Sequence, residues 1–86
     1  MFTVYVIYNR KWQRYYVGST NNYIERMARH NSGRSRYTRG GIPWELIYSI
    51  ECETRPEAYR LEQKIKKRGI RRFLDDNNIR GVAQSG

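Results

Sequence analysis

Five side chains suited to phosphate chemistry lie in three stretches of the sequence. Tyr5 and Tyr16 stand eleven residues apart, each inside a run rich in β-branched and aromatic residues. Arg26 and His30 follow with a spacing of i to i+4, so on a helix their side chains would share one face and could reach a single anion. Glu62 comes later, beside apolar residues with helical spacing. Together these groups predict a site for phosphoryl transfer or hydrolysis.

Each of these side chains also has an ordinary structural interpretation. A strand tyrosine such as Tyr5 is usually buried, with a structural partner for its hydroxyl group. Arg26 and His30 on a helix surface would be solvated. Glu62 would form an i to i+4 ion pair with Lys66, which typically stabilises a helix by about 0.5 kcal/mol or less. The residues alone leave both interpretations open.

The strand signals predict a small antiparallel sheet. Residues 2–8 and 15–19 indicate a hairpin with a polar connection. We expect its first strand to be central, with Tyr5 on the face opposite Val4. Residues 45–52 alternate and predict a third strand with one buried face. That face would carry Leu46, Tyr48, Ile50 and Cys52.

The segment 22–31 predicts the first helix. Asn21 and Asn22 are suitable N-cap residues, and Glu25 places an acidic side chain in the first turn. We expect the buried face of this helix to be aliphatic. It would consist of Ile24, Met27 and Ala28.

The segment 55–68 predicts a second and longer helix. Thr54 and Glu57 form a capping-box pattern at its start, and Gly69 is suited to end it. Residues 70–74 then indicate a short amphipathic helix or turn. The inner face of the long helix would carry Ala58, Leu61 and Ile65.

Length and charge narrow the class of protein. The chain has 86 residues, with 17 Lys and Arg against 8 Asp and Glu, which gives a formal net charge of +9. This length suits one domain with a modest core. A large positive charge on a small body attracts polyanions, so nucleic acid is the leading partner. We expect no membrane partner, because no apolar run approaches the roughly 20 residues of a spanning helix.

The single cysteine, Cys52, excludes an intramolecular disulfide and a cysteine-rich zinc site. Its position at the end of an alternating strand suits a small buried apolar group. No signal-peptide pattern precedes the first strand. We therefore expect a cytoplasmic protein that associates with the nucleoid when it is bound to DNA.

A basic loop follows the first helix and is suited to grip phosphates. Arg34, Arg36 and Arg39 alternate with small and hydroxyl-bearing residues. Guanidinium groups and accessible backbone are typical of contacts that hold the sugar–phosphate chain without reading bases. Lys66 and Lys67 on the long helix are further candidates. A flexible solvated loop is the ordinary alternative.

Several short motifs together resemble one known family. Thr3-Val4-Tyr5 followed by Tyr16-Val17-Gly18 is similar to the paired motif of the GIY-YIG endonucleases, with Thr3 at the first glycine position. The similarity covers about residues 2–74 and is greatest to the short stand-alone bacterial members. Four more runs occur in the order of that group: Gly18-Ser19-Thr20-Asn21, His30-Asn31-Ser32-Gly33, Tyr37-Thr38-Arg39-Gly40 and Pro43-Trp44-Glu45-Leu46.

The resemblance implies a role for each candidate side chain. Tyr5 would orient or deprotonate the attacking water, and Tyr16 would position that water or the phosphate. Arg26 would stabilise the transition state, and His30 would assist proton transfer. Glu62 would ligate a single Mg²⁺ or Mn²⁺ ion, completed by water and phosphate oxygens. No small-molecule cofactor is expected.

The expected fold is therefore of the α+β class, with a three-stranded antiparallel sheet flanked by helices in the order β-β-α-β-α. We allow for an extra short helix before the third strand and another at the C-terminus. Residues 1–75 would form the nuclease-like domain, and residues 76–86 a polar tail.

The expected function is a metal-dependent endonuclease that cleaves DNA by structure rather than by sequence, for example in DNA repair. Branched DNA and RNA are both compatible with phosphate-directed binding. One alternative is a catalytically silent nucleic-acid-binding module on the same fold. A second is a basic surface protein that binds acidic partners or RNA structurally. The sequence does not specify the oligomeric state.

Overall fold

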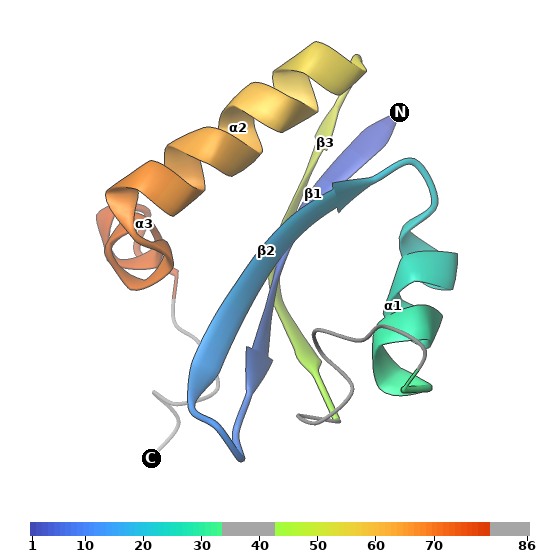
Figure 1. The fold of residues 1–86 in the computed structure, drawn as a ribbon. Helices are drawn as coiled ribbons and strands as arrows, with labels where there is room; N and C mark the ends of the chain where they lie inside the picture. The colour runs from blue at the N-terminus through green and yellow to red at the C-terminus, as the bar shows by residue number, and fades with distance from the viewer. Residues whose placement is uncertain (34–42, 80–86) are drawn as a thin grey trace.

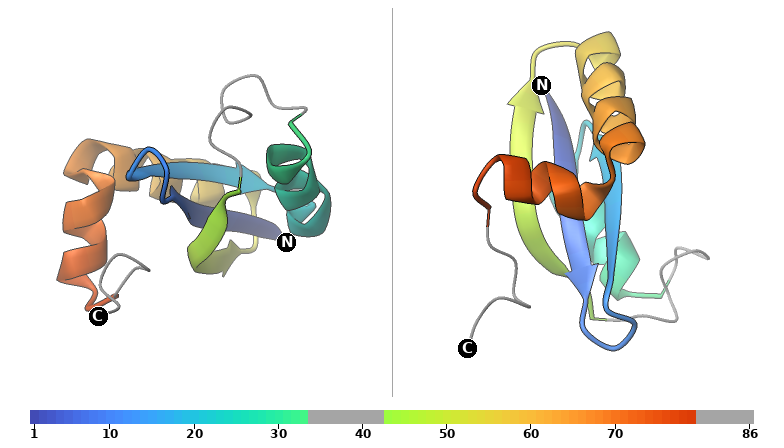
Figure 2. Two further views of the ribbon diagram at one scale, coloured as in Figure 1. Left: turned by 90° about the horizontal axis from the view of Figure 1, so that it is seen from below. Right: turned by 90° about the vertical axis from the view of Figure 1, so that its left-hand side faces the viewer.

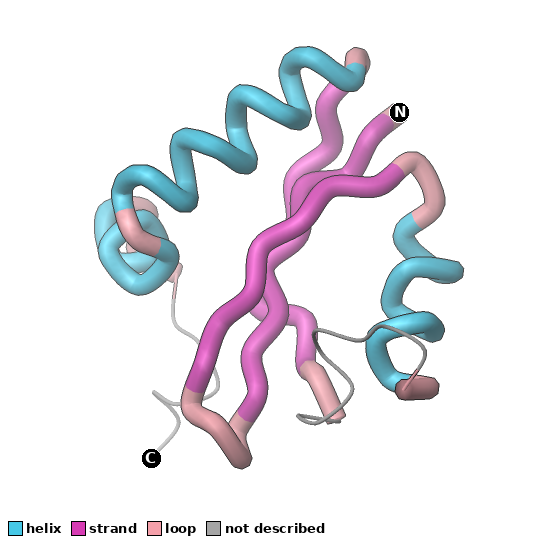
Figure 3. The backbone as a smooth tube through the Cα atoms, in the orientation of Figure 1, coloured by secondary structure: helices cyan, strands magenta, loops and turns pink. Residues whose placement is uncertain are grey.

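The computed structural model describes residues 1–33 and 43–79 and confirms the expected α+β class. Figures 1 and 3 show strands crossing the centre of the molecule, with helices on either side. All the predicted strands and helices are present, and their bounds agree with prediction to within about two residues. In chain order the elements are β1 (Phe2–Asn9), β2 (Arg14–Thr20), α1 (Tyr23–Asn31), β3 (Glu45–Cys52), α2 (Arg55–Arg68) and α3 (Ile70–Asp76).

The three strands form one antiparallel sheet in the order β2-β1-β3, so β1 is central as predicted. The register between β1 and β2 places Tyr5 opposite Gly18 and Ile7 opposite Tyr16. Because side chains alternate along a strand, Tyr5, Ile7 and Tyr16 share one face of the sheet. The hairpin register therefore places both candidate tyrosines on the same side.

Helices cover both faces of this sheet. Figure 1 shows α2 and α3 on one side and α1 on the other, and Figure 2 shows the same layers from two more directions. The face with Val4 and Val6 forms the main core against α2 and α3. The opposite face places Tyr5 and Ile7 in a smaller cluster with Trp44. The strand alternation predicted for β1 is confirmed.

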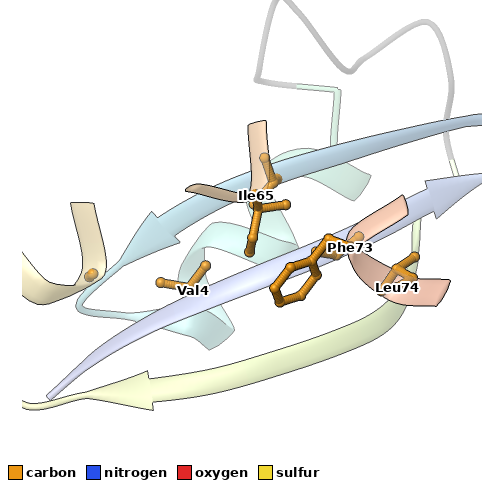
Figure 4. Packing of buried hydrophobic residues seen from close by; sticks show 7 residues of the cluster. Val4, Ile65, Phe73 and Leu74 are labelled. Carbon is orange, nitrogen blue, oxygen red and sulfur yellow. The ribbon is translucent and has the colours of Figure 1, made fainter. Parts of the chain in front are cut away.

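The main core depends on the predicted inner face of α2. Ala58 and Ile65 are buried, and Leu61 packs beside them. The Thr54–Glu57 capping box is complete, and Gly69 ends the helix with a φ of 96°. Figure 4 shows how residues from α2, α3 and β1 meet in this core: Val4, Ile65, Phe73 and Leu74.

The predicted aliphatic face of α1 is wrong. Ile24 is 81 % exposed and Ala28 is also exposed, whereas Met27 is partly buried. The helix instead turns Tyr23, Met27 and His30 toward the sheet. The helix packs on the sheet face that carries tyrosine rings of β1 and β2, and these rings accept aromatic and imidazole edges. Asn22 caps the helix as predicted.

The predicted single buried face of β3 is also wrong in part. Leu46 and Ile50 are exposed, while Ile47 and Tyr48 both pack against the main core. A register irregularity opposite Val6 and Ile7 inserts one extra residue, which shifts the alternation within the strand. As an edge strand, β3 is covered less completely than β1. Cys52 packs against the core, as its position suggested.

Two predictions concern segments at or beyond the limits of the described residues. The extra helix allowed before β3 would fall within 34–42, which lies outside the described residues. The extra helix near the C-terminus is present as α3, and beyond it Ile79 packs against the main core. Within the described ranges, no helix is long and apolar enough to cross a membrane.

Two isoleucine-to-alanine substitutions test this assignment of buried faces. Ile65→Ala should lower the free energy of unfolding by about 2–5 kcal/mol, because it leaves a cavity among buried side chains. Ile24→Ala removes the same atoms from an exposed position and should change it by about 0.5 kcal/mol or less. Chemical denaturation measures both values. A large loss for Ile24→Ala would show that α1 packs through its aliphatic face after all.

Candidate active site

The centre of the candidate site is a contact between Tyr5 and His30. Tyr5 lies in the middle of β1 and is fully buried. Its hydroxyl oxygen lies 2.9 Å from Nε2 of His30, which is only 2 % exposed in the last turn of α1. This is the structural partner that a buried tyrosine hydroxyl needs, and it comes from 25 residues along the chain.

Gly18 makes room for the Tyr5 hydroxyl group. A Cβ atom at Gly18 would lie 2.6 Å from the Tyr5 hydroxyl oxygen and 2.9 Å from Cζ. The ring of Tyr5 therefore lies across the backbone of β2 at its cross-strand partner. This close approach explains physically why a glycine stands two residues after Tyr16.

The ring of His30 packs between the two tyrosines. Ring centroids lie 5.8 Å apart for Tyr5 and His30, and 5.3 Å apart for Tyr16 and His30, both in edge-to-face geometry. Tyr23 adds a further edge contact to Tyr5, at 6.1 Å. The imidazole is thus held by rings from β1 and β2, and its orientation toward the Tyr5 hydroxyl is restricted.

His30 is held in its neutral form. Burial lowers its pKa below the usual 6.5, and the charges of Arg26 and Arg29 lower the pKa further. A neutral imidazole has one ring nitrogen that accepts a hydrogen bond. When the proton is on Nδ1, the Nε2 atom is an acceptor for the Tyr5 O–H group.

Tyr5, in turn, is a weak acid in this environment. Burial raises the pKa of its hydroxyl from 10.0 to about 12, and the nearby Tyr16 adds to this increase. Arg26 lowers the pKa and Glu62 raises it, so both charges lie within electrostatic range of Tyr5. The effect of Arg26 is smaller than that of burial. Without a further cation, Tyr5 stays protonated at neutral pH.

Glu62 lies on α2, which packs on the sheet face opposite α1 (Figure 1), and it contacts the edge strand β2. Its side chain is 15 % exposed. One carboxylate oxygen accepts a 2.8 Å hydrogen bond from the Ser19 hydroxyl group on β2. The other lies 2.9 Å from the ammonium nitrogen of Lys66, which confirms the i to i+4 ion pair. The hydrogen bond to this carboxylate raises the pKa of Lys66.

The donor set around Glu62 suits a hard cation that keeps most of its water. Mg²⁺ typically binds through one or two carboxylates plus substrate phosphates and several water molecules. Glu62 supplies such a carboxylate beside the Ser19 and Lys66 side chains. No cluster of three or more His, Cys, Asp or Glu residues occurs in residues 1–33 and 43–79. The residues therefore fit an open one-carboxylate site.

The structure brings the five predicted side chains together from four elements: Tyr5, Tyr16, Arg26, His30 and Glu62. Lys66 adjoins them through Glu62, and Lys67 is an exposed residue of α2. The predicted phosphate contacts Arg34, Arg36 and Arg39 lie outside the described residues.

Sequence reasoning missed the side chains that hold the site in place. Ser19 ties α2 to β2 through Glu62. Asn31 pairs with the backbone of Trp44, accepting from its N–H at 2.7 Å and donating to its carbonyl at 3.3 Å. The motif positions of Ser19, Asn31 and Trp44 were the only signal that could have identified them.

The candidate site thus consists of two tyrosines on one face of a three-stranded sheet, an arginine and a histidine from the helix on that face, and a glutamate at the sheet edge. The family model of the GIY-YIG catalytic domain matches residues 1–72, and the chain belongs to the GIY-YIG family. Domains of this family are nucleases that act on nucleic acid and generally use divalent metal ions.

Two relatives with similar sequences are UPF0213 proteins from bacteria. The UPF0213 protein of Streptococcus pneumoniae serotype 4 is 35 % identical over 72 residues, which cover 79 % of this chain and 73 % of the relative. The UPF0213 protein of Bacillus licheniformis is 32 % identical over 71 residues, covering 78 % and 73 %.

A solved structure of the same group has a similar fold. The solution NMR structure of a UPF0213 protein from Bacillus halodurans superposes with a TM-score of 0.58 at 27 % identity. The match covers 95 % of this chain and 88 % of that one. The resemblance seen in the short motifs therefore extends over the whole fold.

Gly18→Ala tests the close approach of the Tyr5 ring. The new methyl group should displace the Tyr5 hydroxyl from His30 and destabilise the protein by about 1–3 kcal/mol, because a buried ring must move. Chemical denaturation measures the loss. Repeating the substitution in a Tyr5→Phe background removes the atom at 2.6 Å, so the loss should be smaller there. Equal losses in both backgrounds would mean that the hydroxyl does not fill this space.

The lowered pKa of His30 predicts a loss of stability in mild acid. His30 is the sole histidine of the chain. Below its unfolded pKa of 6.5 the unfolded chain binds a proton that the folded chain does not yet bind, so stability falls as pH falls. Above pH 6.5 the contribution of the neutral His30 side chain to the free energy of unfolding is fully present.

Thermal unfolding from about pH 8 to about pH 5 measures this effect. His30→Gln should flatten the decrease in melting temperature below pH 6.5, since the titrating group is gone. Asp76, whose pKa is lowered from 3.8, titrates outside this range. An equally steep decrease in the variant would assign the acid sensitivity to other groups.

Proposed function

We propose that this protein is a metal-dependent endonuclease that hydrolyses phosphodiester bonds in DNA and selects its substrates by structure. The observation that supports this most directly is the buried Tyr5–His30 hydrogen bond of 2.9 Å, within range of Arg26 and Glu62. A neutral acceptor, a hydroxyl group and a cation converge there. That combination is what activation of a water molecule beside a phosphate requires.

The Tyr5–His30 pair solves the problem of the high tyrosine pKa. With a pKa of about 12, Tyr5 cannot be an ionised base at neutral pH. We propose instead that Tyr5 takes a proton from the attacking water while its own proton passes to Nε2 of His30. The negative charge moves to the water oxygen, and the positive charge ends on the imidazole. His30 can accept the proton because its lowered pKa keeps it neutral.

The remaining side chains would act on the phosphate. Tyr16 packs on the His30 ring and would position the water or a phosphate oxygen. Arg26 is half-buried beside Tyr5, where its charge would stabilise negative charge in the transition state. Glu62 would hold a single Mg²⁺ or Mn²⁺ ion. Such an ion, when bound, neutralises charge on phosphate oxygens and lowers the pKa of coordinated water.

The charge distribution supports DNA as the substrate. The chain carries a net charge of +9, Lys66 lies beside Glu62 on α2, and Lys67 is exposed on the same helix. Phosphate contacts of this kind orient a nucleic acid without reading its bases. Arg34, Arg36 and Arg39 remain proposed contacts to DNA phosphates. The proposed setting is cytoplasmic DNA, for example during repair.

A catalytically silent binding module is the second candidate, and one observation favours it. Both oxygens of Glu62 already have partners, in Ser19 and Lys66. A metal ion would have to replace the Lys66 ammonium group. If that exchange is unfavourable, the same surface would bind nucleic acid without cleaving it.

Glu62→Gln separates these two functions. If Glu62 ligates the metal, cleavage of branched or linear DNA in Mg²⁺ or Mn²⁺ should fall about 10²-fold or more. Glutamine keeps an oxygen for the Ser19 hydroxyl, so the fold should survive. DNA affinity measured without metal should stay level or rise slightly, because a negative charge is removed.

Glu53→Gln provides the matched control, since it removes the same charge from an exposed residue outside α2. Its cleavage rate should equal that of the wild type. Unchanged cleavage by Glu62→Gln would refute the metal-ligand role. Absence of metal-dependent cleavage by the wild type across single-stranded, flapped, branched and duplex DNA would favour the binding module.

A further inference from the structure

The turn between β1 and β2 presents a large aromatic side chain among cations. Trp12 is 40 % exposed at this turn, although tryptophan is strongly apolar. Lys11 and Arg14 flank it and are exposed. Arg10 forms an ion pair with Glu45 at 2.9 Å. Lys11 and Arg14 are therefore the cations considered as contacts for an anion at this turn. An exposed aromatic ring among cations is typical of nucleic-acid contacts.

A buried amide group fixes this turn. Asn9 is fully buried, and its side-chain oxygen accepts a 2.6 Å hydrogen bond from the Trp12 backbone N–H. Its amide nitrogen donates to the Pro43 carbonyl at 3.2 Å. Gln13 adopts a φ of 54°, a left-handed conformation that is uncommon outside glycine. The turn is thus connected to the segment that leads into β3, and Trp12 is held in place.

Aromatic contacts connect Trp12 to the candidate active site. The Trp12 and Trp44 rings meet edge to face at 6.3 Å, and Trp44 meets Tyr16 at the same centroid distance. Tyr16 in turn packs on His30. Asn31 holds the Trp44 backbone through two hydrogen bonds. A continuous row of rings therefore runs from the hairpin turn to His30.

The surface beside this row is hollowed. A pocket of about 220 Å³ is lined by Trp12, Arg14, Tyr15 and Trp44. A second hollow, of about 450 Å³, shares Tyr15 with the first and includes Tyr16 and Lys66 in its lining. The first is large enough for one flat heteroaromatic ring, and the second is lined by Lys66, the ion-pair partner of Glu62. Together they outline a path for successive nucleotides.

We propose that the pocket lined by Trp12, Arg14, Tyr15 and Trp44, here named the stacking site, binds an unpaired nucleobase next to the cleaved phosphate. The proposal rests on the proposed nuclease function and specifies its substrate class. A base can present its face to Trp12 only when it is not stacked inside a duplex. The preferred DNA would therefore carry an unpaired nucleotide at the cleavage point, as in a flap, a bulge or a single strand.

The charges and the aromatic rings of the stacking site both favour an unpaired nucleobase as its ligand. Arg14 lines the pocket, and Lys11 is adjacent in the turn, so the phosphates on either side of a bound base would meet cations. Stacking on aromatic rings tolerates any base, because every base has a π face. The stacking site would thus select for an unpaired state of the DNA without selecting a sequence.

Binding of short DNAs without metal tests the proposal separately from catalysis. The probes are a thymidine decamer, the same decamer with abasic residues in place of the bases, and a fully paired duplex. The wild type should bind the decamer about tenfold or more tightly than its abasic analogue. Trp12→Ala should remove most of this difference and leave duplex affinity unchanged, because only the stacked base is lost.

Matched variants distinguish stacking from other effects. Trp12→Phe keeps an aromatic face and should retain much of the preference for the decamer. Ile50→Ala removes an exposed apolar side chain from the other edge of the sheet and should have no effect. Arg14→Gln and Arg71→Gln remove the same charge, but only Arg14→Gln should weaken decamer binding beyond its effect on the duplex. Thermal melts confirm that each variant is folded.

Two results would overturn the proposal. One is equal binding of the decamer and its abasic analogue by the wild type. The other is an unchanged preference in folded Trp12→Ala. Because metal is absent, neither result depends on cleavage, so a missing nuclease activity and a missing stacking site are detected independently.

Discussion

Much of the structure depends on one buried hydrogen bond, between the hydroxyl group of Tyr5 and Nε2 of His30. Burying two polar groups is costly unless each finds a partner, so this contact determines how α1 lies on the sheet. It also requires Gly18, because the Tyr5 ring crosses the strand where a Cβ atom would otherwise lie. The histidine is kept neutral by the same burial that keeps the tyrosine protonated. One contact thus orients a helix and pairs a neutral imidazole with a protonated hydroxyl group.

Polar contacts connect the surrounding elements to the sheet in a similar way. Ser19 joins β2 to α2 through Glu62, and Asn31 joins α1 to the backbone of Trp44. Asn9 joins the β1–β2 turn to Pro43. Each is a short side chain with a donor or acceptor at a fixed distance, so each restricts the relative placement of two segments more sharply than apolar packing does. The site is therefore built on contacts between elements rather than within them.

The sequence predicted the elements and the inner face of α2, but not how α1 faces the sheet. Strand alternation, the Asn22 cap and the Thr54–Glu57 capping box act over a few residues, and local patterns report them correctly. The predicted buried face of α1 was wrong because Tyr5, 25 residues away, forms a hydrogen bond that buries His30 in place of the aliphatic Ile24. The predicted alternation of β3 was wrong in part because a register irregularity interrupts it, and that irregularity arises only in the pairing with β1.

The candidate site residues could be proposed only through the similarity of their motifs to a known family. Nothing local distinguishes Glu62 as a ligand from Glu62 as the partner of Lys66, and the structure contains that ion pair. Ser19, Asn9 and Asn31 have long-range partners that leave no periodic pattern in the sequence. Their roles become visible only when the strands and helices are placed in space.

The shortness of α1 has a consequence for local folding. A helix of nine residues is too short to persist in water by itself, so α1 depends on what it touches. Its contacts with the sheet are made largely by Tyr23, Met27 and His30, together with the Asn31 pairing to Trp44. Detachment of α1 would withdraw both His30 and Arg26 from Tyr5 at once. Docking of this helix and assembly of the reactive groups are thus one cooperative unit, whose opening need not involve the main core.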